Sequence, residues 1–166
     1  MKRTMVLSGM VLLLLAGMAA AQVIIRIRRP ERLPAPPPAP KLEAIAETRL
    51  LMEGLAQPNY RALEKLLKEK PADVEAWTFA RGQALLLAET GNLLMLRPPR
   101  NAGETAWMAR ATELRTAAAE LARQAGKSDL ERTRGAILNV AASCNRCHET
   151  FRIKVRVGPE ARAPGS

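Results

Sequence analysis

Histidine, cysteine and aromatic residues are scarce in this chain of 166 residues. It contains one histidine and two cysteines, and 3% of its residues are aromatic. A structural zinc site needs four Cys or His ligands, so these three residues are too few for one. Strands favour aromatic and β-branched side chains, whereas Ala and Leu, which are abundant here, favour helix. The composition therefore predicts an all-α domain.

Acidic residues are also in deficit. The chain has 16 Asp and Glu against 26 Lys and Arg, which gives a formal net charge of +10. Nucleic-acid-binding proteins gather their basic residues into a patch or stripe, often with aromatic side chains among them, and no such run occurs here. We therefore expect no nucleic-acid partner. The moderate basic excess from Lys41 onward is of the kind that steers an acidic protein partner.

The N-terminus has the order of charges and apolar residues that is typical of an export signal. Lys2 and Arg3 precede an apolar stretch over residues 5–18, and three alanines at residues 19–21 come before Gln22. This pattern predicts a signal peptide over residues 1–21 that is cleaved before Gln22. The expected location of the domain is the periplasm.

An uncleaved membrane anchor is the alternative for the same segment. Residues 23–25 extend the apolar run toward the roughly 20 residues that span a bilayer. The arginine cluster that follows opposes a stable anchor with its C-terminal side outside, because positive charge prefers the cytoplasmic side. Both versions place the domain outside the cytoplasm, the second with the N-terminal segment as a membrane tether.

Residues 22–40 are rich in proline and are predicted to be a linker. Arg29-Pro30, Leu33-Pro34 and the run at residues 36–40 remove backbone donors and favour an extended polyproline II conformation. The last residues, 158–166, are small and are predicted to form a flexible tail. A single domain over residues 41–157 lies between these segments.

Four main helices and one shorter amphipathic piece are predicted within this domain. Short connections between helices of this length favour an antiparallel four-helix bundle. Ser128 and Glu131 are three residues apart, as in a capping box, and are expected to start the last helix. The predicted helices are residues 41–57 (ending at Pro58), the shorter piece 59–70, then 73–95, 104–124, and the last from Ser128 onward.

The last helix carries the sequence Cys144-Asn145-Arg146-Cys147-His148, a C-x-x-C-H motif. This motif is the attachment signature of c-type haem. Two cysteines three residues apart on a helix project from nearly the same side, so both can reach the vinyl groups on one edge of the porphyrin. His148 can then turn its imidazole toward the iron as an axial ligand. The motif predicts one covalently bound haem c with its iron as the cofactor.

Two other interpretations of the cysteine pair explain less of the sequence. A thioredoxin-like redox pair follows a strand in a βαβ unit, whereas this motif follows a long helical pattern. A disulfide between Cys144 and Cys147 is sterically awkward within a helix and leaves His148 without a role. The haem interpretation accounts for all three residues.

A four-helix bundle with C-x-x-C-H near the end of its last helix resembles the cytochrome c-prime family and its low-spin relatives. The aromatic Phe151 and the basic Arg152 after the histidine match that family's pattern, and the resemblance covers about residues 42–152. It implies a haem held inside the bundle and His148 partly open to solvent. It also implies a distal face formed by the first helix, on which Arg49 meets a haem propionate. Homodimers are common in the family.

Arg49 and Arg152 are the candidate charged residues of the site. Arg49 falls on an apolar stripe with Ile45 and Met52, where a charge needs a partner. Arg152 lies one turn beyond His148 and is expected on the same helix face; it is either a positive charge near the haem or a solvated residue at a helix end. Trp77 and Trp107 are expected in the core rather than at the cofactor.

The sixth ligand of the iron decides the function. A single histidine excludes bis-histidine ligation, and outside the export segment three methionines remain, namely Met52, Met95 and Met108. Met52 shares the first helix with Arg49, and in low-spin members of the family a first-helix methionine binds the iron. We therefore predict an electron carrier, not an enzyme, with His148 and Met52 as metal ligands.

A high-spin, five-coordinate cytochrome that binds small gases such as nitric oxide is the alternative function. Leu51 or Leu55 would then face the iron in place of Met52, as an apolar residue does in the family's high-spin members. The redox partner is not identified by the sequence.

Overall fold

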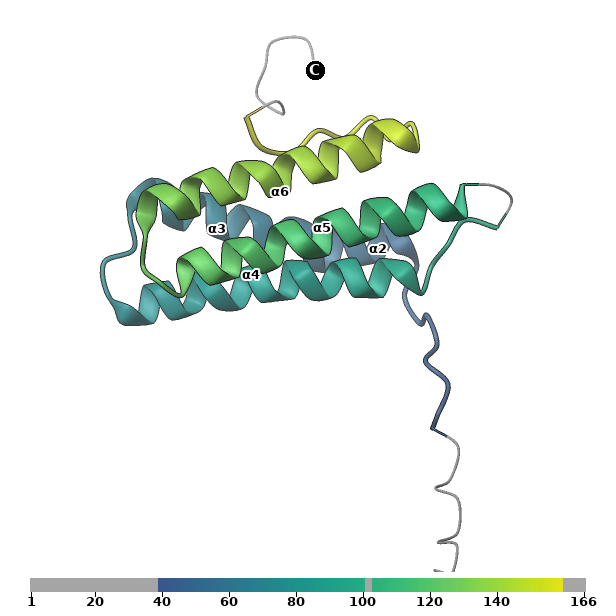
Figure 1. Ribbon diagram of the computed structural model, residues 1–166, viewed down its shortest axis with the longest axis horizontal. Coiled ribbons are helices and arrows are strands. Elements are labelled where there is room, and N and C mark those ends of the chain that lie inside the picture. Colours follow the sequence, from purple (N-terminus) through teal and green to yellow (C-terminus); the bar gives the residue numbers. More distant parts are fainter. Residues whose placement is uncertain (1–38, 101–102, 160–166) are drawn as a thin grey trace, which may run out of the picture. The chain divides into compact units, whose positions relative to one another are not determined.

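Helices make up the regular structure of the part of the chain that the computed structural model describes, residues 39–100 and 103–159. The predicted signal peptide, most of the linker and the end of the tail lie outside these residues. The described residues from Lys41 onward form one compact unit (Figure 1). Its elements are α2 (Thr48–Leu51), the π-helical turn η1 (Met52–Ala56), α3 (Gln57–Glu69), α4 (Val74–Met95), α5 (Glu104–Ala125) and α6 (Leu130–Thr150).

Because α2, η1 and α3 follow one another without a break, they form one continuous first helix, and the fold is an all-α four-helix bundle, as predicted. Short connections join the helices, so that each runs antiparallel to the one before it (Figure 1). None of the described helices combines the length and apolar character that crossing a bilayer demands.

Small residues bring α4 and α5 close together. Ala80, Ala84 and Ala118 are fully buried between the helices. A Cβ atom on Gly91 would lie 2.9 Å from the carbonyl oxygen of Ala111 on the neighbouring helix, so only glycine allows this approach. Larger side chains fill the remaining core, among them the fully buried Leu63, Leu87, Leu121 and Val140.

The first helix differs from its predicted bounds of residues 41–57. It begins at Thr48 and continues past Pro58 to Glu69. The prediction that Pro58 ends it was wrong, because the π-helical turn lies directly before the proline. Proline lacks an N–H and its ring clashes with the carbonyl four residues earlier. In the wider π turn the Gln57 N–H donates to the carbonyl five residues back, at Met52, and this local widening accommodates the proline.

Residues 41–47 are not helical. Leu42 and Ile45 are 82% and 87% exposed, so the apolar stripe predicted through them is not buried. The carbonyl of Ala46 accepts a hydrogen bond from Arg97 Nε at 2.9 Å, which fixes the chain just before α2.

The start of α6 also differs from the prediction. Its N-cap is Asp129, whose carboxylate accepts from the Arg132 N–H at 3.0 Å. Ser128 has a φ of 55° and lies in the turn before the helix. The predicted Ser128–Glu131 capping box was therefore wrong by one residue, because an aspartate side chain caps a helix as well as serine does.

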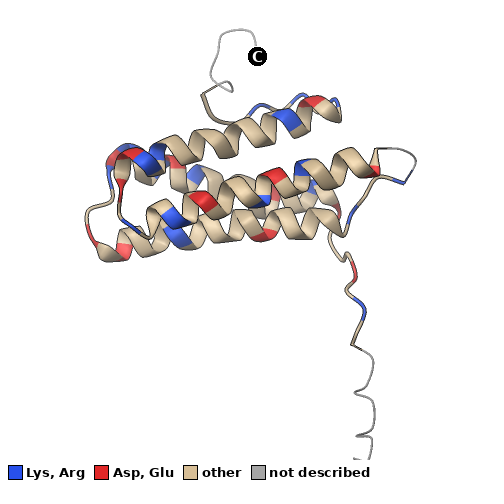
Figure 2. Ribbon diagram, in the orientation of Figure 1, with Lys and Arg blue, Asp and Glu red and all other residues tan. Residues whose placement is uncertain are grey.

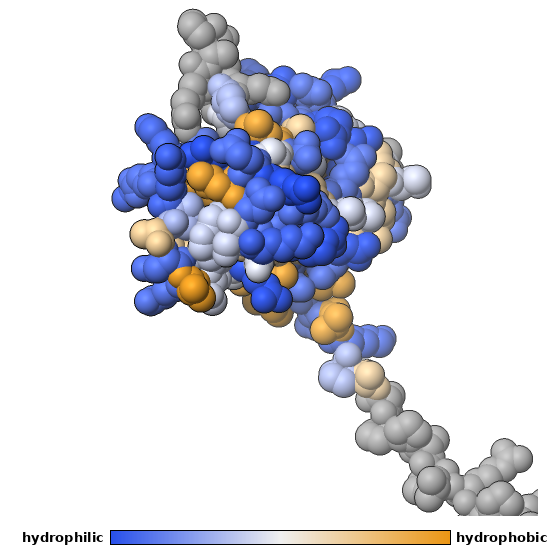
Figure 3. All heavy atoms as spheres, turned by 60° about the vertical axis from the view of Figure 1, so that its left-hand side comes forward, coloured by the Kyte–Doolittle hydropathy of each residue, from blue (hydrophilic) through white to orange (hydrophobic). Residues whose placement is uncertain are grey.

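The charged residues that the structure describes are exposed or half-buried, and Figure 2 shows how they are distributed along the helices. On the face that Figure 3 shows, hydrophilic residues surround small, separate apolar areas. The charged outer surface and the alanine- and leucine-rich interior together explain why four amphipathic helices close around one core.

Candidate functional site

A cavity of about 1190 Å³ opens between the first helix, α4, α5 and α6. Its volume lies just above the range of about 300–1,000 Å³ in which small-molecule and cofactor sites usually fall, so it is large enough for a flat macrocycle. Five of the six predicted site residues line it. They are Arg49, Met52, Cys144, Cys147 and His148.

Cys144 and Cys147 are both half-buried free thiols on α6. Burial raises the pKa of the Cys144 thiol to about 11, with a further contribution from the charge of Cys147. Burial also raises the pKa of Cys147. Redox-active and metal-binding cysteines need a lowered pKa. The surroundings of this pair therefore oppose a thioredoxin-like role and favour neutral thiols that face a mostly apolar cavity.

The residues near the two cysteines also disfavour a thiolate metal centre. Within the described residues, no three His, Cys, Asp or Glu side chains come together as a metal site would require. The chain's single histidine and both cysteines lie in that part.

The imidazole of His148 is fixed by a backbone carbonyl. Its Nδ1 atom lies 2.7 Å from the carbonyl oxygen of Val155. A carbonyl only accepts, so Nδ1 carries the proton in this contact and Nε2 of the neutral ring keeps its lone pair free. This is the arrangement that metal-binding histidines usually show. His148 is therefore prepared to ligate iron through Nε2.

The carbonyl of Val155 belongs to a segment that sequence reasoning missed. After α6, residues 152–158, here called the C-terminal strap, return along the helix that carries the motif. The strap lines the cavity with Ile153, Val155 and Val157. These residues alternate with Lys154 and Arg156, and this two-residue period was the available signal for an extended segment packed on one side. The predicted domain ends at residue 157 and the predicted tail starts at 158, so this boundary falls within the strap. Gly158 is buried and belongs with the rest of the strap.

Met52 is the one methionine within residues 39–159 that is found in the lining of the cavity. It is half-buried and is the first residue of η1. Leu51 is buried in the core and Leu55 packs against that core, and neither belongs to the cavity lining. Met95 and Met108 also lie outside the lining. The structure therefore places Met52 toward the cavity, and its ligation of iron stays a prediction.

Arg49 lines the cavity but is not on a buried face. Its side chain is 82% exposed and pairs with Glu53 at 2.8 Å. The hydrogen bond and the charge of that carboxylate raise the pKa of Arg49. The predicted burial was wrong because Arg49 lies in the first turn of a helix that starts only at Thr48. Its contact with a haem propionate stays a prediction.

Arg152 does not share a helix face with His148. The helix ends at Thr150, and Arg152 has a φ of 58° in the turn that starts the strap. It is exposed and does not belong to the cavity lining. Arg152 was expected to be either a positive charge near the haem or a solvated residue at a helix end. Its position agrees with the solvated residue, close to the end of α6.

Two aromatic residues that were not assigned to the site contribute to it. Trp107 and Phe151 line the cavity and contact each other edge to face, with ring centroids 5.1 Å apart. The Trp107 indole donates to the Leu94 carbonyl at 2.7 Å. Trp77 packs against the core, as expected. Trp107 packs against the core and also lines the cavity.

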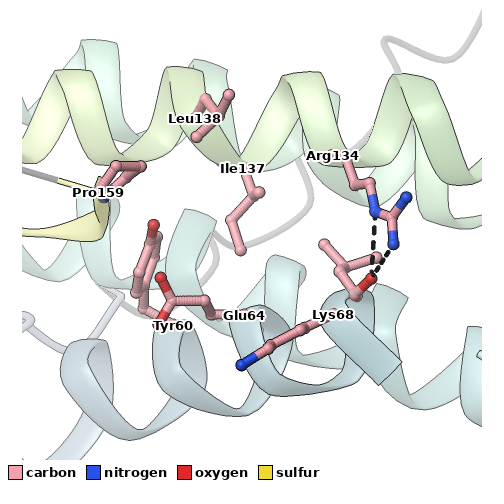
Figure 4. A pocket seen from close by; sticks show the side chains of 8 residues that line it. Tyr60, Glu64, Lys68, Arg134, Ile137, Leu138 and Pro159 are labelled. Carbon is pink, nitrogen blue, oxygen red and sulfur yellow. Dashed lines mark hydrogen bonds between the residues drawn. The ribbon is translucent and has the colours of Figure 1, made fainter. Parts of the chain in front are cut away.

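A second, smaller groove of about 190 Å³ lies between α3 and α6 (Figure 4). Tyr60 and Glu64 line both this groove and the cavity. At one end, Arg134 donates two hydrogen bonds to the Leu67 carbonyl, at 3.2 and 2.9 Å. The groove contains neither the histidine nor the cysteines, so the chemistry of the molecule belongs to the larger cavity.

The residues around the cavity fit a covalently attached haem. Two neutral thiols face it from one helix, a histidine with a free Nε2 follows them, and aromatic and aliphatic side chains make up much of the lining. Cys144, Cys147 and His148 would hold the group.

Comparison with known proteins points to the same cofactor. Residues 103–152 match the family model described as Cytochrome C'. The match covers α5 and α6, the two helices that carry Trp107 and the C-x-x-C-H motif, and it implies a c-type haem. No curated protein and no solved structure matches the chain. The match confirms that the chain resembles the cytochrome c-prime family, over the helices that carry its site.

Proposed function

We propose that this protein is a periplasmic mono-haem c-type cytochrome that carries electrons. In this proposal Cys144 and Cys147 bind one haem covalently, and His148 and Met52 ligate its iron. The observation that carries the proposal is the position of Met52. It is the one methionine among the described residues that lines the cavity shared with His148.

Each residue has a separate task in this arrangement. Cys144 and Cys147 fix the cofactor to α6, and His148 presents Nε2 because Nδ1 is held by Val155. Met52 presents a thioether from the first helix, and an axial methionine raises the reduction potential. Trp107 and Phe151 help to exclude water from the cavity. When bound, the haem supplies an iron that gains and loses one electron.

Electron transfer is favoured over enzyme catalysis. If both His148 and Met52 held the iron, they would leave no position on it for a substrate. The alternative is a five-coordinate cytochrome that binds small gases such as nitric oxide, which requires Met52 to fill space without ligating.

The location and the partners are proposed from the sequence. The signal pattern before Gln22 favours export, with an uncleaved segment as a membrane tether in the alternative version. The basic excess of the domain favours an acidic redox partner. A homodimer follows from the resemblance to the family.

The test is the spectrum of the haem-loaded protein and of two methionine variants. The parent protein should be low-spin in the ferric state, with the weak far-red band of sulfur ligation, and should take up carbon monoxide slowly. Met52→Leu keeps the volume of the side chain but removes its sulfur, so it should become high-spin and take up carbon monoxide faster.

Met95→Leu is the matched control, because Met95 packs against the core and does not line the cavity. Its spectrum should equal that of the parent protein. A parent protein that is already high-spin would contradict ligation by Met52 and would move the gas-binding function to first place.

A further inference from the structure

We infer that Asn145, one of the two variable residues of the C-x-x-C-H motif, is a positioning residue for His148. It holds the C-terminal strap so that the Val155 carbonyl orients the imidazole toward the cavity. The inference rests on the proposed function, because it concerns how His148 presents Nε2 to iron. It assigns a task to a motif position that neither attaches nor ligates the haem.

The first observation is the pairing of Asn145 with the strap. Asn145 is 4% exposed. Its Nδ2 donates to the Val157 carbonyl at 3.1 Å, and its Oδ1 accepts from the Val157 N–H at 2.9 Å. The carboxamide thus satisfies both backbone polar groups of one residue. No other side chain of this size offers a donor and an acceptor in the same fork.

The strap is anchored on both sides of Val155. Ile153 lies two residues before Val155, and its N–H donates a hydrogen bond to the His148 carbonyl at 2.7 Å. The Asn145–Val157 pair lies two residues after it. An extended segment held at both of these points has little freedom to move its central carbonyl, and that carbonyl is the one that accepts from His148.

Gly158 provides a further anchor. It has a φ of 76°, and a Cβ atom on it would lie 2.8 Å from Ala141 Cβ and 2.9 Å from the Tyr60 hydroxyl. The strap therefore lies directly against α6 and the first helix at this point, and only glycine permits both the conformation and the approach. Figure 4 shows Pro159, the next residue, beside Tyr60.

The exposed ion pair in the same region contributes less. Arg156 and Glu149 are 2.8 Å apart, but both side chains are accessible to solvent. Pairs of this kind are weak. The Asn145–Val157 pair, made by a buried side chain, therefore contributes more to the position of the strap than this ion pair does.

A hydrogen bond from Nδ1 to a fixed carbonyl sets the orientation of an imidazole and raises the basicity of Nε2. A more basic ligand stabilises the oxidised iron. Loss of the bond should therefore raise the reduction potential, and the ring should become free to rotate. A residue that only stabilised the fold would lower the free energy of unfolding without changing the potential.

The test uses the haem-loaded full-length protein with Asn145→Ala, and Asn139→Ala as its matched control. Asn139 is an exposed asparagine on the same helix. Three quantities are measured: the midpoint potential, the NMR signal of the His148 Nδ1 proton, and the concentration of added imidazole that displaces His148. Asn145→Ala should raise the potential, accelerate exchange of the Nδ1 proton and lower the displacing concentration by about 10–100-fold. Asn139→Ala should leave all three unchanged.

Gly158→Ala displaces the strap at the residue next to Val157, without touching Asn145, and should change the same quantities in the same direction. Gly135→Ala is its control, because a Cβ atom there meets nothing within 4 Å. Asn145→Asp keeps the acceptor for the Val157 N–H but loses the donor, so its effects on proton exchange and on the displacing imidazole concentration should be intermediate. Its potential is not used for the comparison, because the added negative charge by itself lowers the potential. This variant also serves if Asn145→Ala does not fold.

Two kinds of failure are distinguishable. If the parent protein shows no ligation by His148, the proposed function fails. If His148 is a ligand but Asn145→Ala and Gly158→Ala leave the potential, the Nδ1 proton exchange and the displacing imidazole concentration unchanged, the proposed function stands and the positioning role of Asn145 is overturned.

Discussion

At the scale of single residues, the placement of the two cysteines and the histidine on one helix beside a shared cavity could be predicted from the sequence, whereas the contacts around them could not. The motif at Cys144, Cys147 and His148 is local, because its spacing alone determines which side of the helix carries the thiols. The contact of His148 with Val155 depends on where the chain turns after α6. Arg152 shows the same limit: it was placed by helical spacing, but the helix ends at Thr150.

Arg49 gives a prediction at this scale. If Arg49 lies near a haem propionate, Arg49→Gln removes a positive charge close to the iron. The loss of this charge stabilises the oxidised state and therefore lowers the midpoint potential. Because the side chain is 82% exposed, the decrease should be small and should shrink as salt is added, since the Debye length is about 10 Å at 0.1 M. Potentiometry at low and high ionic strength measures it.

Glu53→Gln is the partner experiment, because Glu53 is the carboxylate that pairs with Arg49. It should raise the potential, with the same dependence on salt. Potentials that stay constant in both variants at low salt would mean that Arg49 is a solvated surface residue.

At the scale of helices, the sequence predicted the long, periodic elements well. The expected helices over residues 73–95 and 104–124 correspond to α4 and α5 within one residue at each end. The first helix was missed at both ends. Its start depends on what residues 41–47 could pack against, and its passage through Pro58 depends on a π-helical turn that no local pattern announces. The strap was missed because short extended segments have weak local signals.

Gly91 and Gly82 on α4 give a matched prediction about helix packing. A Cβ atom on Gly91 would lie 2.8 Å from the backbone nitrogen of Arg115 and 2.9 Å from the Ala111 carbonyl oxygen. Gly91→Ala should therefore force α4 and α5 apart and lower the unfolding free energy by about 1–3 kcal/mol. A Cβ atom on Gly82 meets nothing within 4 Å, so Gly82→Ala should raise it by about 0.5–1 kcal/mol.

Urea unfolding of the two variants beside the parent protein measures both changes. Opposite shifts of the midpoint are expected. Equal shifts in the same direction would mean that the close approach of α4 to α5 at Gly91 is not maintained in solution.

At the scale of the whole molecule, the charges around the site are uneven. Near the end of α6 and on the strap, Arg146 pairs with Glu113, and Arg156 pairs with Glu149. Arg152 and Lys154 are exposed, and neither forms an ion pair with another described residue. Figure 2 shows blue segments along the strap and both blue and red at the end of α6. Two positive charges without an ion-pair partner among the described residues therefore lie on the segment that also fixes His148.

These charges should steer anionic redox partners toward the site. The double variant Arg152→Gln, Lys154→Gln should slow electron transfer to ferricyanide by roughly two- to ten-fold at low ionic strength and accelerate transfer to a cationic cobalt complex, because attraction becomes weaker and repulsion is relieved. Stopped-flow measurements over a range of salt concentrations test this. Lys70→Gln, Lys127→Gln is the control, since both residues lie in turns next to the far ends of α3 and α6. If the two double variants change the rates equally, only the net charge matters and the strap is not the docking face.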